Sequence, residues 1–137
     1  MFDDNRVIAM ARSLGLALQK EETFRNYFEA KRKNDEDVLL QNMIDDFNEL
    51  QKKLDVAFSK YEKDTEEIEV LSNDMNRLYQ AIMENENMVN YNEMREPYDT
   101  LTKYINRILL VAMNGGDPFA VKETDCTGNC STCGGCG

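Results

Sequence analysis

Apolar residues recur at helical intervals along almost all of the chain before residue 115, and this pattern narrows the possible folds most. In the first segment, Val7, Ala11, Leu14 and Leu18 are spaced by four, three and four positions, which places them on one side of an α-helix. Only Pro97 and Gly15 interrupt the pattern. We therefore predict an all-α fold, an antiparallel helical hairpin or bundle of about five helices.

Three further stripes repeat the helical spacing. The first predicts a helix from about 36 to 61, and the second opens at Asp64-Thr65-Glu66-Glu67, which resembles a capping box. Asn85 or Asn87 restarts the chain before the third stripe. The stripes comprise Leu39, Met43, Phe47, Leu50, Leu54 and Phe58, then Ile68, Leu71, Met75, Leu78 and Ile82, then Tyr91, Met94, Tyr98, Leu101, Ile105, Ile108 and Ala112.

Breaks between these stripes are expected at three places. The aromatic patch of Phe24, Tyr27 and Phe28 fits a second helix or a bent continuation of the first. The polar run KRKNDED at 31–37 is expected to interrupt the helices, with Asn34 or Asp35 as a cap. Pro97 should kink the last helix or mark its start, and we expect a kink.

Gly115-Gly116-Asp117-Pro118 is a strong stop signal, because glycine suits the position after a helix and proline cannot continue it. We therefore predict a helical domain over residues 1–114 and a Cys-rich tail over residues 115–137. The tail has almost no apolar residue after Val121, so it cannot fold by burial and is expected to be flexible unless it binds something.

Composition excludes several classes of function. The net charge of −10 disfavours direct binding of nucleic acid, because such binding depends on neutralising phosphates. The absence of histidine removes His-dependent acid–base chemistry and Cys2His2 zinc sites, which excludes most familiar enzyme designs. No export signal or membrane-spanning stretch is expected, and the default location is the cytoplasm, where thiols stay reduced.

All four cysteines, Cys126, Cys130, Cys133 and Cys136, lie in the last stretch, CTGNCSTCGGCG. They are clustered, so they cannot tie the rest of the chain together as disulfides would. Four thiolates form the soft ligand set that suits iron–sulfur clusters, zinc or copper(I). The dense spacing of three, two and two residues favours a 4Fe–4S iron–sulfur cluster. Zinc is the alternative cofactor.

Two other interpretations of the cysteines carry less weight. Cys133-Gly-Gly-Cys136 offers a thiol-redox pair, but it lacks the helix N-terminus that normally activates one. The first three cysteines match the spacing of radical S-adenosylmethionine enzymes, but those enzymes carry the motif on a large β/α barrel that this chain cannot form. A metal-binding tail therefore remains the leading prediction, and a thiol-redox protein the least favoured one.

The layout as a whole resembles the YlbF/YmcA family of small helical bacterial regulators over roughly residues 3–136. The segments that carry the resemblance are Val7–Leu18, Phe24-Arg-Asn-Tyr-Phe28, the stripe at 39–58, the closing helix at 85–113 and the terminal CTGNCSTCGGC. The last of these is the most specific, because it looks like the tail of YlbF-type members.

The resemblance implies a non-enzymatic regulatory adaptor. Members act in a complex of YlbF-, YmcA- and YaaT-like proteins that carries iron–sulfur clusters and works with the endoribonuclease RNase Y in mRNA processing. Effects on competence, sporulation and biofilm formation follow from that role. The same resemblance assigns the cluster to the four cysteines, held by one chain or shared between subunits. Separately, the heptad-like patterning of the long helices favours a homo- or hetero-oligomer. No direct contact with nucleic acid or membrane is expected.

Overall fold

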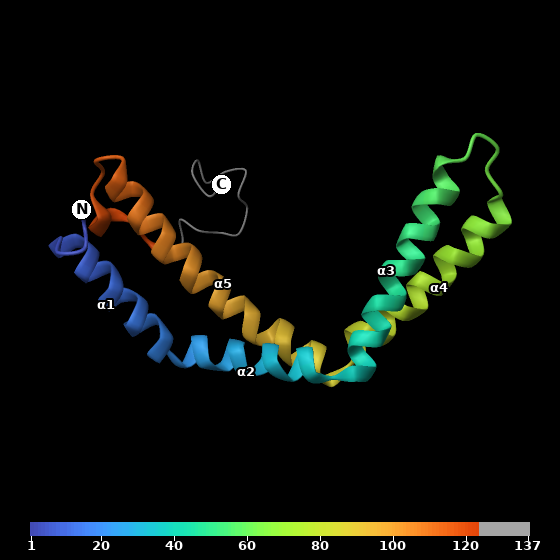
Figure 1. The fold of residues 1–137 in the computed structure, drawn as a ribbon, viewed down its shortest axis with the longest axis horizontal. Helices are drawn as coiled ribbons and strands as arrows, with labels where there is room; N and C mark the ends of the chain where they lie inside the picture. Colours follow the sequence, from blue (N-terminus) through green and yellow to red (C-terminus); the bar gives the residue numbers. More distant parts are fainter. Residues whose placement is uncertain (124–137) are drawn as a thin grey trace. The chain divides into compact units, whose positions relative to one another are not determined.

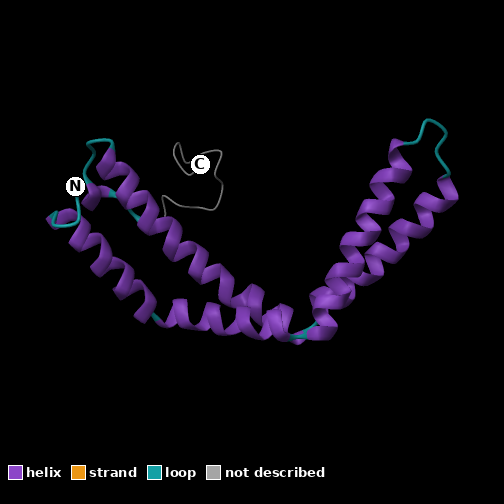
Figure 2. Cartoon of the chain, viewed as in Figure 1, coloured by secondary structure: helices purple, strands orange, loops and turns teal. Residues whose placement is uncertain are grey.

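The computed structural model describes residues 1–123, which form an all-α fold (Figure 1). No strand occurs among these residues (Figure 2). Their helices include no candidate for a membrane-spanning segment. The predicted fold of about five antiparallel helices is confirmed. The helices are α1, Arg6–Lys20; α2, Glu22–Glu36; α3, Val38–Ser59; α4, Thr65–Glu84; α5, Glu86–Met113; and the short 3-10 helix η1, Pro118–Ala120.

The chain divides into two compact units. The hairpin unit comprises residues 28–92, and the terminal unit comprises residues 1–27 together with residues 93–123. The boundaries fall inside α2 and α5, so each of these helices contributes to both units.

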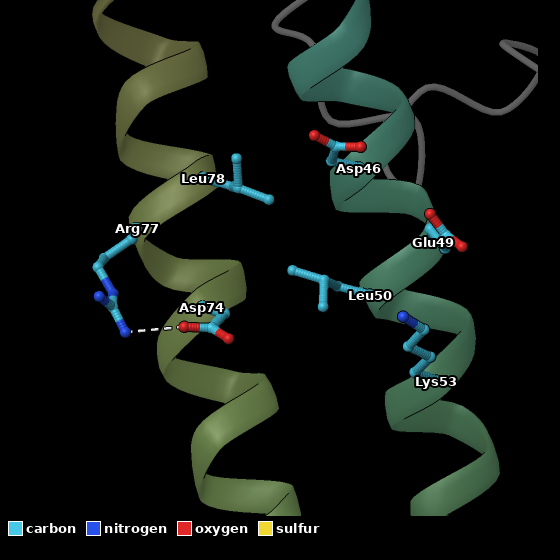
Figure 3. A pocket seen from close by; sticks show the side chains of 7 residues that line it. All are labelled: Asp46, Glu49, Leu50, Lys53, Asp74, Arg77 and Leu78. Carbon is cyan, nitrogen blue, oxygen red and sulfur yellow. Dashed lines mark hydrogen bonds and ion pairs between the residues drawn. The ribbon is translucent and has the colours of Figure 1, made fainter.

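In the hairpin unit, α3 and α4 run antiparallel, and their apolar stripes face each other. Leu50 of α3 and Leu78 of α4 point toward one another across the interface (Figure 3). Leu40 is fully buried, and Ala57 and Ile82 are nearly so. Most other residues of the stripes are only half-buried, because a two-helix layer leaves both sides of its seam open.

The two ends of the α3 stripe differ from the sequence prediction. Leu39 and Phe58 were placed in the stripe, but both are exposed, while their neighbours Leu40 and Ala57 are buried. The ideal α-helix advances by 3.6 residues per turn, so a seven-residue repeat drifts around the helix over several turns. The buried face therefore includes Leu40 at one end and Ala57 at the other.

The predicted boundaries of these two helices are confirmed. The helix expected at about 36–61 is α3, Val38–Ser59. At the start of α4, Asp64 accepts hydrogen bonds from the backbone N–H groups of Glu66 and Glu67, both at 3.1 Å. This cap satisfies two donors that the first turn of a helix otherwise leaves unpaired.

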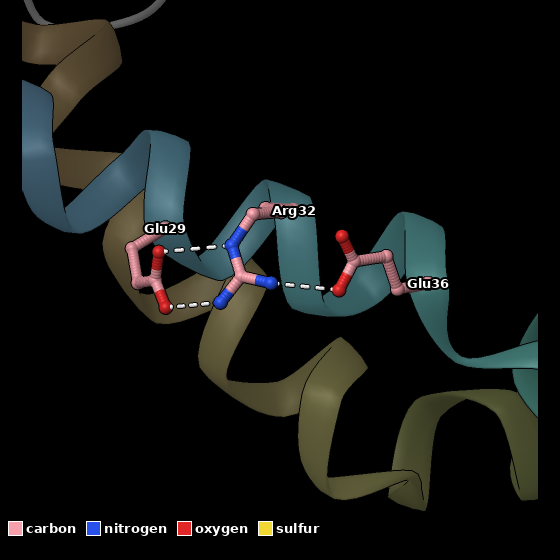
Figure 4. Close-up of polar contacts among 3 residues, drawn as sticks. All are labelled: Glu29, Arg32 and Glu36. Atoms are coloured by element: carbon pink, nitrogen blue, oxygen red, sulfur yellow. Dashed lines mark hydrogen bonds and ion pairs between the residues drawn. The ribbon is translucent and has the colours of Figure 1, made fainter.

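The polar run at 31–37 does not break the chain where the sequence predicted. The helix α2 continues through it to Glu36, so the expected caps Asn34 and Asp35 are wrong. Arg32 forms ion pairs with Glu29 at 2.6 Å and Glu36 at 2.7 Å, at the i,i+3 and i,i+4 spacings that support a helix (Figure 4). The true cap is Asp37.

In the terminal unit, α1 and α5 run antiparallel (Figure 1). The aromatic patch belongs to a second helix, because Glu21 ends α1 in an extended conformation. Tyr27 stacks on Tyr98 with ring centroids 4.3 Å apart, and Phe24 meets Tyr98 edge-on at 6.1 Å. These rings join α2 to α5.

Pro97 lies inside α5, which is continuous over Glu86–Met113. The alternative that Pro97 marks the start of the last helix is therefore wrong, because α5 begins eleven residues earlier, at Glu86. The kink at Pro97 stays a prediction.

The stop signal after α5 is confirmed in atomic detail. Gly115 takes the left-handed conformation, with φ of 82°. Its N–H donates to the Ala112 carbonyl at 3.0 Å, and the Gly116 N–H donates to the Val111 carbonyl at 2.9 Å. This pair of bonds is a Schellman motif, which satisfies the last carbonyls of the helix.

Candidate functional site

Outside the described residues lie the four predicted metal ligands, Cys126, Cys130, Cys133 and Cys136. Most of the predicted tail lies there too, so its flexibility stays a prediction. Within residues 1–123, no group of three or more Cys, Asp or Glu side chains is arranged to hold a metal ion. The donor chemistry of the four thiolates fits a 4Fe–4S cluster or tetrahedral zinc. The metal site at the four cysteines stays a prediction.

The segment that leads to these cysteines is held against α5. Asp117 accepts a hydrogen bond from the Phe119 N–H at 2.9 Å and so caps η1. The Tyr104 hydroxyl donates to the Val121 carbonyl at 3.2 Å. Glu123 then lines a depression of about 410 Å³, together with Glu96, Pro97, Thr100, Leu101 and Tyr104. Glu123, the last described residue, thus lies beside the middle of α5.

A polar joint ties two helix starts together in the hairpin unit. One oxygen of Asp37 accepts the Leu40 N–H at 3.0 Å and caps α3. Its other oxygen accepts the side-chain amides of Asn85 at 3.2 Å and Asn87 at 2.9 Å. Asn85 in turn caps α5 through the N–H groups of Asn87 and Met88. We call Asp37, Asn85 and Asn87 the Asp37 joint.

A buried asparagine completes the polar contacts at this place. Asn34, only 7% exposed, donates from its side-chain nitrogen to the Met88 sulfur at 3.8 Å. The side chain of Gln41 donates to both the backbone and side-chain oxygens of Asn34, at 2.8 and 3.2 Å. A buried amide with satisfied partners favours one arrangement of helices over others. Here it fixes α2, α3 and α5 relative to one another within the hairpin unit.

The Asp37 joint makes the stability of the hairpin unit depend on pH. Hydrogen bonds from Leu40, Asn87 and Asn85 lower the pKa of Asp37 below its ordinary value. Because the folded state holds the lower pKa, the contribution is complete above the unfolded pKa of about 4 and is lost as pH falls through the folded value. We expect Asp37→Asn to lower the urea midpoint at neutral pH, and the gap to wild type to narrow below about pH 4.

Circular dichroism across a pH series measures both effects. Asp45→Asn is the matched control, because Asp45 is an exposed aspartate in α3 whose side chain makes no hydrogen bond in the described chain. Equal pH profiles for the two variants would contradict the role of the joint.

Large apolar side chains remain exposed on both units. In the terminal unit, α1 has no buried residue. In the hairpin unit, exposed side chains flank the seam between α3 and α4. An extensive exposed apolar surface marks sites of interaction with other macromolecules. The exposed set includes Val7, Met10, Leu14, Leu16, Val38, Leu39, Val56, Phe58, Val70, Tyr79, Met83, Leu109, Met113 and Phe119.

These features define an all-α protein with a thin core and many exposed apolar side chains. The family described as control of competence regulator ComK, YlbF/YmcA, matches residues 7–114. The chain therefore belongs to the YlbF/YmcA family, a family of regulators, which confirms the resemblance read from the sequence. Comparisons with curated proteins and with solved structures find no match.

Proposed function

We propose that this chain is a non-enzymatic regulatory adaptor that acts in an iron–sulfur complex of the YlbF/YmcA/YaaT kind. In that role it modulates RNase Y-dependent mRNA processing and, through it, competence, sporulation and biofilm formation. The observation that carries the proposal is the family match over residues 7–114. Partners and pathway come from the resemblance of the chain to that family.

The surface of the helical body supports an adaptor role. Most of its large apolar side chains are exposed or half-buried, and Leu40 is the largest side chain that is fully buried. A chain that uses so little apolar surface for its own core has much of it left to bury against partners. The acidic net charge of −10 also favours protein partners over direct contact with RNA.

The chemistry of the tail supports a cluster. Cys126, Cys130, Cys133 and Cys136 would hold it, and the small residues between them leave backbone N–H groups free to bond cluster sulfur. A bound 4Fe–4S cluster would supply sensitivity to iron or oxygen. Zinc is the second candidate, since the same four thiolates match its preferred tetrahedral set.

Anaerobic co-purification of the tagged full chain from its native cells tests the proposal. We expect YmcA-like and YaaT-like proteins and RNase Y to be recovered with it, together with iron and sulfide. An equal pull-down with a chain ending at residue 123 is the control, and it should lose the iron. Recovery of the chain alone would contradict the adaptor role, while recovery of partners with zinc would leave the adaptor role and overturn the cluster.

A further inference from the structure

One face of α1 is apolar, exposed and bordered by positive charge. Val7, Met10 and Leu14 follow one another at intervals of three and four, so they lie along one side of the helix. They are 69%, 61% and 39% exposed. The spacing is that of the anchor residues with which a helix lies in an apolar groove. We call these three residues the α1 stripe.

The charge of α1 is opposite to that of the rest of the chain. It carries three basic residues, Arg6, Arg12 and Lys20, and no acidic one, although the whole chain has a net charge of −10. Arg6 precedes Met10 by one helical turn, and Arg6 makes no ion pair in the described chain. The surface that complements this helix is therefore apolar along its centre and acidic at its edge.

A groove of this kind lies on the hairpin unit, between α3 and α4 (Figure 3). Leu50 and Leu78 form its apolar floor, and its volume is about 430 Å³. Asp46, Glu49 and Asp74 line it alongside Lys53 and Arg77. Together α3 and α4 carry nine acidic and three basic residues.

The acidic groups of this groove are available for a new partner. Asp74 is already paired with Arg77 at 2.7 Å. Asp46 and Glu49 make no ion pair within residues 1–123. Asp46 lies one helical turn before Leu50, just as Arg6 lies one turn before Met10. Seating Met10 on the two leucines with α1 parallel to α3 therefore brings Arg6 to the acidic end of the groove.

We propose that the α1 stripe of one copy of this chain docks in the α3–α4 groove of a second copy. Pairing of α1 with α1 of another copy is disfavoured, because it would bring cations together. An anionic membrane is also a poorer partner: three cations add only about 1 kcal/mol each near such a surface, and the remaining acidic residues are repelled. This contact makes the chain self-associate. It depends on neither the tail nor a metal.

Sedimentation equilibrium of the full chain at low and high salt tests the docking. We expect wild type to associate, and high salt to weaken the association because the ion pairs are exposed. Met10→Glu should raise the dissociation constant at least about tenfold, since it places a charge on the central anchor. Leu16→Glu is the matched control: Leu16 is 60% exposed on the same helix but lies outside the stripe.

A charge exchange makes the test specific for the two surfaces. Arg6→Glu in one chain and Asp46→Lys in another should each weaken self-association about five- to tenfold. An equal mixture of the two variants restores both ion pairs and should regain wild-type association. Misfolding would not be rescued by mixing, and circular dichroism of each variant checks the fold.

Three results would overturn the docking. They are a monomeric wild type at all concentrations, equal effects of Met10→Glu and Leu16→Glu, and no recovery in the mixture. Binding of wild type, but not Met10→Glu, to phosphatidylserine vesicles without self-association would assign the stripe to a membrane instead. The Cys133→Ser chain should self-associate as wild type does. Failure of the docking proposal can therefore be told apart from failure of the proposed cluster.

Discussion

The variant Cys133→Ser is expected to lose its bound metal while its helical circular dichroism stays unchanged. Removing one of four thiolates leaves a cluster or a zinc ion with an incomplete ligand set, which should reduce metal retention at least about tenfold. The helices should be unaffected, because the Schellman motif at Gly115 and Gly116 ends α5 before the Cys-rich run begins. Metal content per chain after anaerobic desalting, together with the far-ultraviolet spectrum, measures both effects.

Ser131→Ala is the matched control for this change, because it alters the same run of residues without removing a thiol. It should retain the metal of wild type. If Cys133→Ser instead unfolds the helices, the tail is part of the structure and not a separate site. Unchanged metal content in Cys133→Ser would remove Cys133 from the ligand set.

The second large effect is expected at Leu40. Its side chain is fully buried in the first turn of α3, beside the Asp37 joint. Leu40→Ala should lower the free energy of unfolding by about 2–5 kcal/mol, since it removes buried methyl groups and leaves a cavity. In so thin a core, a loss of this size is a large part of the total stability.

Leu39→Ala provides the control, because Leu39 is the preceding residue on the same helix and is 69% exposed. Its substitution should change stability by less than about 0.5 kcal/mol. Urea denaturation compares the two variants. Both are measured at the same protein concentration, because self-association makes the stability depend on concentration. Equal losses from the two would contradict the position of the α3–α4 seam.

Local signals in the sequence predicted most helix ends correctly. Asp64 and the glycines at 115 and 116 act through groups within a few residues, so their spacing alone indicates the cap that each forms. The same local reasoning failed at 31–37, where the ion pairs of Arg32 hold the polar run in a helix. A charge-rich segment can form a helix as well as a loop when opposite charges lie at i,i+4 spacing.

Long-range contacts could not be predicted from one sequence. The Asp37 joint brings together residues 48 and 50 positions apart, and no local pattern indicates that pairing. A signal was present, since an Asp or Asn precedes each apolar stripe as a helix cap does. The choice of Leu40 over Leu39 for burial likewise depends on where α4 lies. The metal site in the Cys-rich tail is predicted from composition and spacing alone, and it stays a prediction.

The most direct test of the proposed adaptor is the iron and sulfide content of the complex isolated anaerobically from native cells. We expect a coloured complex in which this chain is recovered with YmcA-like and YaaT-like partners. Iron and acid-labile sulfide should be present in equal amounts, as a 4Fe–4S cluster requires. A colourless chain recovered without these partners, carrying zinc or no metal, would contradict it.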